Sequence, residues 1–169
     1  LGEINILEES FQEWKKSNKD VDLTELYWNK ANIKSKSKIT TNKYLYNYQY
    51  AGIICNQIPN AKIIHCYRNP LDNILSIYRA NFDKGNEYAS SIVDCANAYL
   101  DQERIMEEYK IKYRSKIYDF NYDKLVNNSH QEIKSLISWL GWEWNDSYLY
   151  PHLNSRAVFT ASCVQVRSP

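Results

Sequence analysis

The stretch that decides the fold is NAKIIHCYRNPLDNILSIY, residues 60–78. Its first half holds five uncharged residues, Ile63–Tyr67, between loop-forming residues, which is typical of a strand buried on both faces of a parallel sheet. Arg68 follows at once, and after it apolar residues recur at helical spacing. Asn69 is a favourable N-cap, and Pro70 suits the first position of a helix. The sequence therefore predicts a strand, a tight turn and a helix that begins at Pro70.

The rest of the chain alternates helical and extended patterns. The spacing of apolar residues predicts helices over residues 4–16, 22–34, 47–57, 87–113 and 129–140, and strands over residues 39–41 and 116–121. We expect Asp22 to cap the second of these helices and Gly141 to end the last. Such alternation is typical of an α/β domain whose mainly parallel sheet is flanked by helices. The length of 169 residues suits one domain.

The composition excludes several classes of protein. Because 44% of the residues are hydrophobic, the chain is no disordered tail. The formal charge of +1 does not suit a general nucleic-acid or membrane-surface binder. No apolar run is long enough to span a membrane. The chain has only four glycines, and they lie too far apart for either kind of glycine-rich phosphate loop. If the chain binds a nucleotide, residues outside a glycine-rich loop must hold its phosphates.

Cysteines and histidines give no sign of a metal site. The four cysteines show no CxxC pair, and the three histidines lack ligand spacing, so we predict no metal. Cys55 and Cys66 stand in apolar runs, where a thiol usually behaves as a small buried hydrophobe. We expect His65 to be a core residue of its strand. A reduced, cytoplasmic protein is the simplest interpretation.

Arg68 stands at the end of the predicted strand, where open α/β sheets bind their ligands. Ser76 follows two turns into the next helix. A guanidinium and a hydroxyl group that converge there can hold a phosphate. The spacing alone favours a structural interpretation, in which Arg68 pairs with Asp72 and Ser76 is an ordinary helix residue, because such short patterns are common.

Residues 62–78 resemble the 3′-phosphate-binding segment of the sulfotransferases that use 3′-phosphoadenosine 5′-phosphosulfate (PAPS), with its pattern R-[DN]-P-x-D-x-x-x-S. Other segments match that family in the same order: TNK at 41–43, PNAKII at 59–64, YDFNYDKLV at 118–126, GWEW at 141–144 and TASCVQVRSP at 160–169. The nearest resemblance is to tyrosylprotein sulfotransferases and to bacterial sulfotransferases fused to tetratricopeptide repeats. It implies a P-loop-NTPase-like α/β fold.

The resemblance also implies roles in binding the sulfate donor. Arg68 and Ser76 would bind the 3′-phosphate of PAPS. Tyr122 would lie near the nucleotide, where its counterpart in tyrosylprotein sulfotransferases helps to hold the 3′-phosphate end. Arg79, on the same helix face as Ser76, would be a further cofactor-binding residue, although its spacing from Ser76 is one residue shorter than in the family.

Three residues would serve the chemistry. By resemblance, Lys43 neutralises charge at the transferred sulfuryl group, and Ser162 lies close to the same centre. Glu3, in a Gly-Glu pair typical of the family, would take the proton from the acceptor hydroxyl. The alternative for Glu3 is a surface charge at a helix start. Asn5 replaces an arginine of the tyrosylprotein enzymes, which disfavours an acidic peptide as the acceptor.

The family's 5′-phosphosulfate loop and first strand lie upstream of the Gly-Glu pair, so we expect residues 1–169 to be a single sulfotransferase domain truncated at its amino terminus. The missing strand would leave an unpaired sheet edge, through which a second copy of the chain can pair. We also expect this chain alone to bind the nucleotide weakly and to transfer sulfate poorly.

Three functions follow from these patterns. The first is a sulfotransferase that moves a sulfuryl group from PAPS to an acceptor hydroxyl, with the 3′,5′-bisphosphate of adenosine as product. The second is a non-catalytic module that keeps only the 3′-phosphate pocket and binds a nucleotide or a partner. The third, a P-loop kinase-like phosphotransferase, fits less well because the chain has no Walker lysine pattern.

Overall fold

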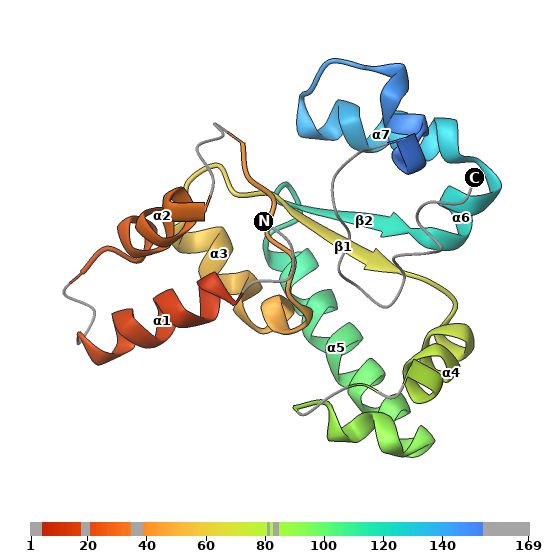
Figure 1. Cartoon of the computed structure of the whole chain (residues 1–169), viewed down its shortest axis with the longest axis horizontal. Helices are drawn as coiled ribbons and strands as arrows, with labels where there is room; N and C mark the ends of the chain where they lie inside the picture. Colours follow the sequence, from red (N-terminus) through yellow and green to blue (C-terminus); the bar gives the residue numbers. More distant parts are fainter. Residues whose placement is uncertain (1–4, 18–20, 35–38, 81, 83–84, 154–169) are drawn as a thin grey trace. The chain divides into compact units, whose positions relative to one another are not determined.

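The computed structural model describes residues 5–17, 21–34, 39–80, 82 and 85–153 (Figure 1). Its helices and strands are α1 (Ile6–Lys16), α2 (Leu23–Lys34), η1 (Leu45–Tyr50), α3 (Ala51–Gln57), β1 (Ile63–Tyr67), α4 (Pro70–Ala80), η2 (Glu87–Ser90), α5 (Ile92–Lys112), β2 (Ile117–Asn121), α6 (Tyr122–Asn127), α7 (Ser129–Leu140), η3 (Asp146–Leu149) and η4 (Pro151–Leu153), where η marks a 3-10 helix. β1 and β2 pair as parallel strands. The predicted α/β class is therefore confirmed.

The described residues fall into two compact units. The first unit takes its residues from the chain up to Ile63 and from Pro70–Ile117, and the second from Ile64–Asn69 and from Tyr118 onward. None of the described helices combines the length and the apolar character that a membrane span requires.

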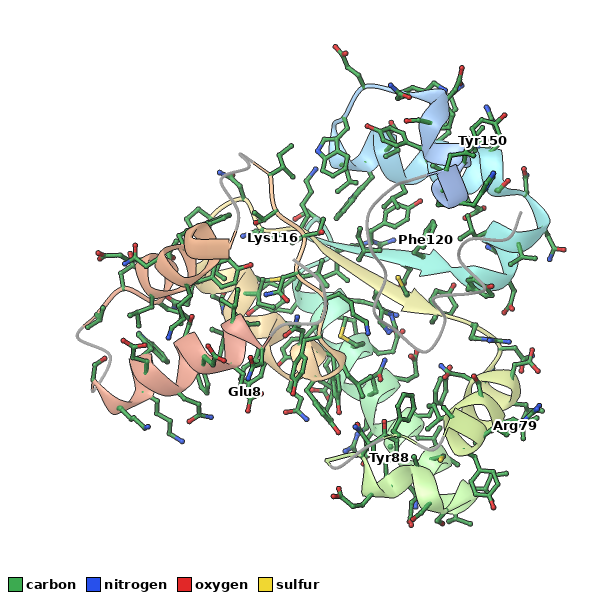
Figure 2. The ribbon with its side chains drawn as sticks, viewed as in Figure 1. Glu8, Arg79, Tyr88, Lys116, Phe120 and Tyr150 are labelled. Atoms are coloured by element: carbon green, nitrogen blue, oxygen red, sulfur yellow. The ribbon has the colours of Figure 1, made fainter. Side chains whose placement is uncertain are left out.

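The first unit has two apolar clusters. In one, α1 and α2 bury Ile6, Leu7, Tyr27, Ala31 and Ile58. The other holds Ala51, Cys55, Met106 and Ile117, where α3 lies against α5 and the start of β2. α3 and α5 approach closely at Gly52, because a Cβ atom there would lie 2.7 Å from Cε1 of Tyr109. The Nζ of Lys116 donates to the Cys55 carbonyl at 2.7 Å and so joins the base of β2 to α3 (Figure 2).

The second unit is organised around the two strands and α7. The ring of Tyr118 on β2 packs against that of Trp139 on α7, with centroids 5.1 Å apart. α7 ends at Gly141, whose φ of 75° lies in the left-handed region that glycine favours. The amide of Trp142 donates to the Ile137 carbonyl at 3.1 Å and completes the helix end.

Several predicted boundaries are confirmed. β1 has the predicted bounds Ile63–Tyr67, and α4 begins at Pro70. The carboxylate of Asp22 accepts a hydrogen bond from the Thr24 amide at 2.8 Å, which is the expected cap of α2.

Other expectations were wrong. Residues 39–41 form no strand, although they are described, because the strand preference of β-branched residues depends on their surroundings. β1 is not buried on both faces, since Ile64 is 38% exposed and Cys66 is also exposed. The helix predicted over residues 87–113 is divided into η2 and α5 at Ser91, whose side chain caps α5 by accepting from the Asp94 amide.

Candidate functional site

The candidate site lies where β1 and β2 end. Arg68 and Asn69 follow β1 directly, and Tyr122 and Asp123 begin α6 directly after β2. Because the two strands are parallel, their carboxyl ends meet at one edge of the sheet. Open α/β sheets bind their ligands outside this edge.

Two contacts join these four residues in pairs. The guanidinium carbon of Arg68 lies 5.5 Å from the centroid of the Tyr122 ring, a cation–π contact. The backbone amide of Asn69 donates to Oδ2 of Asp123 at 2.7 Å. Arg68 is half-buried and Tyr122 is 48% exposed. A guanidinium in such a contact offers N–H donors in a planar fork, which suits a phosphate.

A contact between buried His65 and exposed Asp119 links the strands just before their ends. Nδ1 of His65 lies 3.2 Å from Oδ1 of Asp119, and the imidazole stacks on the Tyr67 ring with centroids 5.9 Å apart. His65 is only 5% exposed, so the expectation of a core histidine is confirmed. The pair fixes β1 to β2 next to the candidate site.

Cys66 offers no nucleophile beside Arg68. Desolvation of its sulfur raises the pKa of the Cys66 thiol, although the residue as a whole is exposed. The thiol is therefore protonated at neutral pH, and the nucleophilic form is the thiolate.

Ser76 and Arg79 lie on α4, both exposed and three residues apart, so they share a helix face. Arg79 stands in the last turn of α4 (Figure 2). α4 belongs to the first unit and Arg68 to the second. That Ser76 and Arg79 converge with Arg68 on one ligand therefore stays a prediction.

Lys43 is exposed and makes a single β-bridge just before η1. The neighbouring Asn42 accepts a hydrogen bond through Oδ1 from Nδ2 of Asn47 at 3.3 Å, which ties this part of the chain to η1. Glu3 and Ser162 lie outside the described residues, so their catalytic roles stay predictions.

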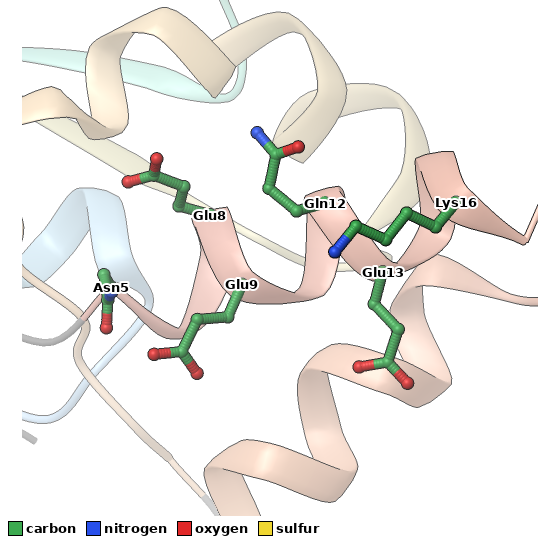
Figure 3. A pocket seen from close by; sticks show the side chains of 6 residues that line it. All are labelled: Asn5, Glu8, Glu9, Gln12, Glu13 and Lys16. Atoms are coloured by element: carbon green, nitrogen blue, oxygen red, sulfur yellow. The ribbon is translucent and has the colours of Figure 1, made fainter.

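A hollow of about 400 Å³ runs along α1 (Figure 3). It is lined by Asn5, Glu8, Glu9, Gln12, Glu13 and Lys16. With three carboxylates the hollow does not favour a phosphate, and it contains no predicted site residue. The described residues also contain no group of three histidine, cysteine or acidic side chains that could hold a metal.

Sequence reasoning missed the contact between Asn69 and Asp123. Asn69 was expected only to cap a helix, and Asp123 had no assigned role. The sequence contained one indication of this contact: Asn69 directly follows Arg68, and Asp123 directly follows Tyr122.

Comparison with known proteins agrees with the predicted fold. A family model described as "Sulfotransferase family" matches residues 6–146. The chain is also similar to an uncharacterized protein of Aquifex aeolicus (strain VF5), with 31% identity over 140 residues, which is 81% of this chain. The match spans 18% of that relative's length. By the extent of the family match, the chain belongs to the sulfotransferase family.

Proposed function

We propose that this chain contributes the 3′-phosphate site of an enzyme that transfers a sulfuryl group from PAPS to an acceptor hydroxyl. The observation that carries the proposal is the cation–π contact between Arg68 and Tyr122 at the carboxyl ends of parallel strands, in a member of the sulfotransferase family. The guanidinium carbon lies 5.5 Å from the ring centroid. The guanidinium supplies a bidentate charged contact to a phosphate, and the ring limits its orientation. Ser76 and Arg79 would add a hydroxyl and a second positive charge.

The chemistry requires charge neutralisation and removal of a proton. In the proposed step the acceptor oxygen bonds to sulfur while the bond from sulfur to the phosphate oxygen breaks. Glu3 takes the hydroxyl proton, and Lys43 and Ser162 stabilise the charge that develops on the sulfuryl and leaving oxygens. These three roles rest on the resemblance of the sequence to the family.

The test measures the binding of adenosine 3′,5′-bisphosphate by isothermal titration calorimetry. Arg68→Ala should abolish binding, and Arg68→Lys should retain only part of it, because lysine offers a point charge without the planar fork. Arg104→Ala is the matched control, since Arg104 is exposed on α5 and pairs with Asp101. Unchanged affinity in Arg68→Ala would refute the proposed site.

Transfer itself needs a separate assay. Incubation with sulfur-labelled PAPS and a panel of sugar, lipid, phenol and peptide hydroxyls should label at least one acceptor, at the slow rate expected of this chain alone. Nucleotide binding that depends on Arg68 without transfer to any acceptor would instead favour the non-catalytic module.

A further inference from the structure

We infer that Asp123 is a positioning residue: its carboxylate holds the turn after β1 against the first turn of α6, and so keeps the Arg68 guanidinium over the Tyr122 ring. The inference rests on the proposed function, because the value of this position is the binding of the 3′-phosphate. It assigns a role to a residue for which the sequence motif gave none.

The geometry supports the inference through two neighbouring contacts. The Asn69 amide donates to Oδ2 of Asp123 at 2.7 Å, a short bond for an N–H donor. Arg68 and Tyr122, each one residue earlier, form the cation–π contact. Because successive residues are covalently coupled, displacement of Asn69 from Asp123 also displaces Arg68 from Tyr122.

Asp123 can act in this way only if its own backbone is fixed. Oδ1 of Asn121 accepts from the Lys124 amide at 2.9 Å and caps α6. Nδ2 of Asn127 donates to the Asp123 carbonyl at 2.8 Å. α6 has only six residues, too few to be stable without such contacts. The Asp123 carboxylate is therefore presented to Asn69 from an anchored turn.

If Asp123 acted only through its charge, loss of its carboxylate would have the opposite effect on nucleotide affinity. A carboxylate next to a phosphate site repels the phosphate, so removing its charge should tighten nucleotide binding. A positioning role predicts weaker binding when the carboxylate is lost, because Arg68 is no longer held. The sign of the change in affinity therefore separates the two roles.

The experiment compares adenosine 3′,5′-bisphosphate with adenosine 5′-phosphate by titration calorimetry, using the whole chain. Asp123→Ala should weaken binding of the bisphosphate roughly tenfold, the effect of losing one charge-assisted hydrogen bond. Binding of the monophosphate, which lacks the 3′ group, should not change. Asp123→Asn keeps an oxygen acceptor for the Asn69 amide and should remain within about twofold of the parent.

Each outcome decides between the two roles. Equal or tighter bisphosphate binding by Asp123→Ala overturns the inference, and so does an equal loss for both nucleotides, which indicates a general structural effect. If Asp123→Ala does not fold, Asp123→Glu replaces it. Its carboxylate is displaced by one methylene, so it should weaken bisphosphate binding selectively, and an unchanged ratio of the two affinities overturns the inference. If the parent chain itself does not prefer the bisphosphate, the proposed function fails instead.

Discussion

At the scale of single residues, substitutions of Tyr122 test whether its ring or its hydroxyl group orients Arg68. A cation–π contact contributes about 0.5 to 2 kcal/mol, depending on how far the pair is desolvated. Tyr122→Leu should therefore weaken binding of adenosine 3′,5′-bisphosphate about fivefold, whereas Tyr122→Phe, which keeps the ring, should stay within about twofold. Calorimetric titration of both variants provides the measurement.

The alternative outcome for Tyr122 is also informative. An equal loss in Tyr122→Phe and Tyr122→Leu would mean that the phenolic hydroxyl, and not the ring face, contacts the nucleotide. The cation–π contact would then have no part in binding.

Residue types at the candidate site were only partly predictable. The resemblance singles out Arg68 and Tyr122 because each belongs to a segment with an implied role. The structure brings the two side chains together, while their binding of a nucleotide stays a prediction. The bond from the Asn69 amide to Asp123 joins positions 54 residues apart. Every residue except proline carries the same backbone N–H donor, so the local sequence does not indicate which amide binds Asp123.

At the scale of elements, the end of α7 is the clearest case for a stability test. Gly141 has a φ of 75°, and a Cβ atom there would meet nothing within 4 Å. Gly141→Ala therefore changes only the cost of the left-handed backbone and should lower the free energy of unfolding by about 1 to 2 kcal/mol. Urea denaturation followed by circular dichroism measures this change.

Gly141→Asn is the matched variant, because asparagine tolerates the left-handed region better than alanine does. It should lose less stability than Gly141→Ala. If both variants are as stable as the parent, the left-handed helix end is not the conformation in solution.

Elements with strong local signals were predicted well, and those that depend on partners were not. Pro70 fixed the start of α4, and Gly141 the end of α7. The strand expected over residues 39–41 did not form, because β-branched residues favour extended structure only in the context of a sheet. The break at Ser91 did have a signal, a serine three residues before Asp94, which is the pattern of a helix cap.

At the scale of the whole molecule, half-buried phenols and buried thiols predict a loss of stability at alkaline pH. Burial raises the pKa of Tyr46 above 10.0, with neighbouring phenols and Glu87 adding to the effect, and burial raises the pKa of Cys55 and Cys95 above 9.0. Each of these three groups is more easily kept protonated in the folded state than in the unfolded state. The contribution of these groups to the free energy of unfolding is therefore complete below their ordinary pKa values and declines as the pH rises past those values.

We expect the free energy of unfolding to fall between pH 8.5 and pH 11, as measured by urea denaturation at each pH. Tyr46→Phe should lower stability at pH 7 by about 1 kcal/mol, because the hydroxyl donates to the Gly85 carbonyl at 2.7 Å, but should make the decline with pH shallower. Tyr78→Phe, at an exposed position on α4, is the control and should leave the slope unchanged. A slope in Tyr46→Phe as steep as that of the parent would contradict the expectation.

The hydrogen bond between the Asn69 amide and Asp123, at the ends of β1 and β2, has a consequence for the timing of folding. The two residues are 54 positions apart in the sequence, with α4 and α5 between them, so they meet only after a long loop has closed. A chain emerging from the ribosome carries Arg68 well before Tyr122 exists. A nucleotide held by both can act only after the two residues have been brought together, and so should prolong the lifetime of the folded state without hastening its formation.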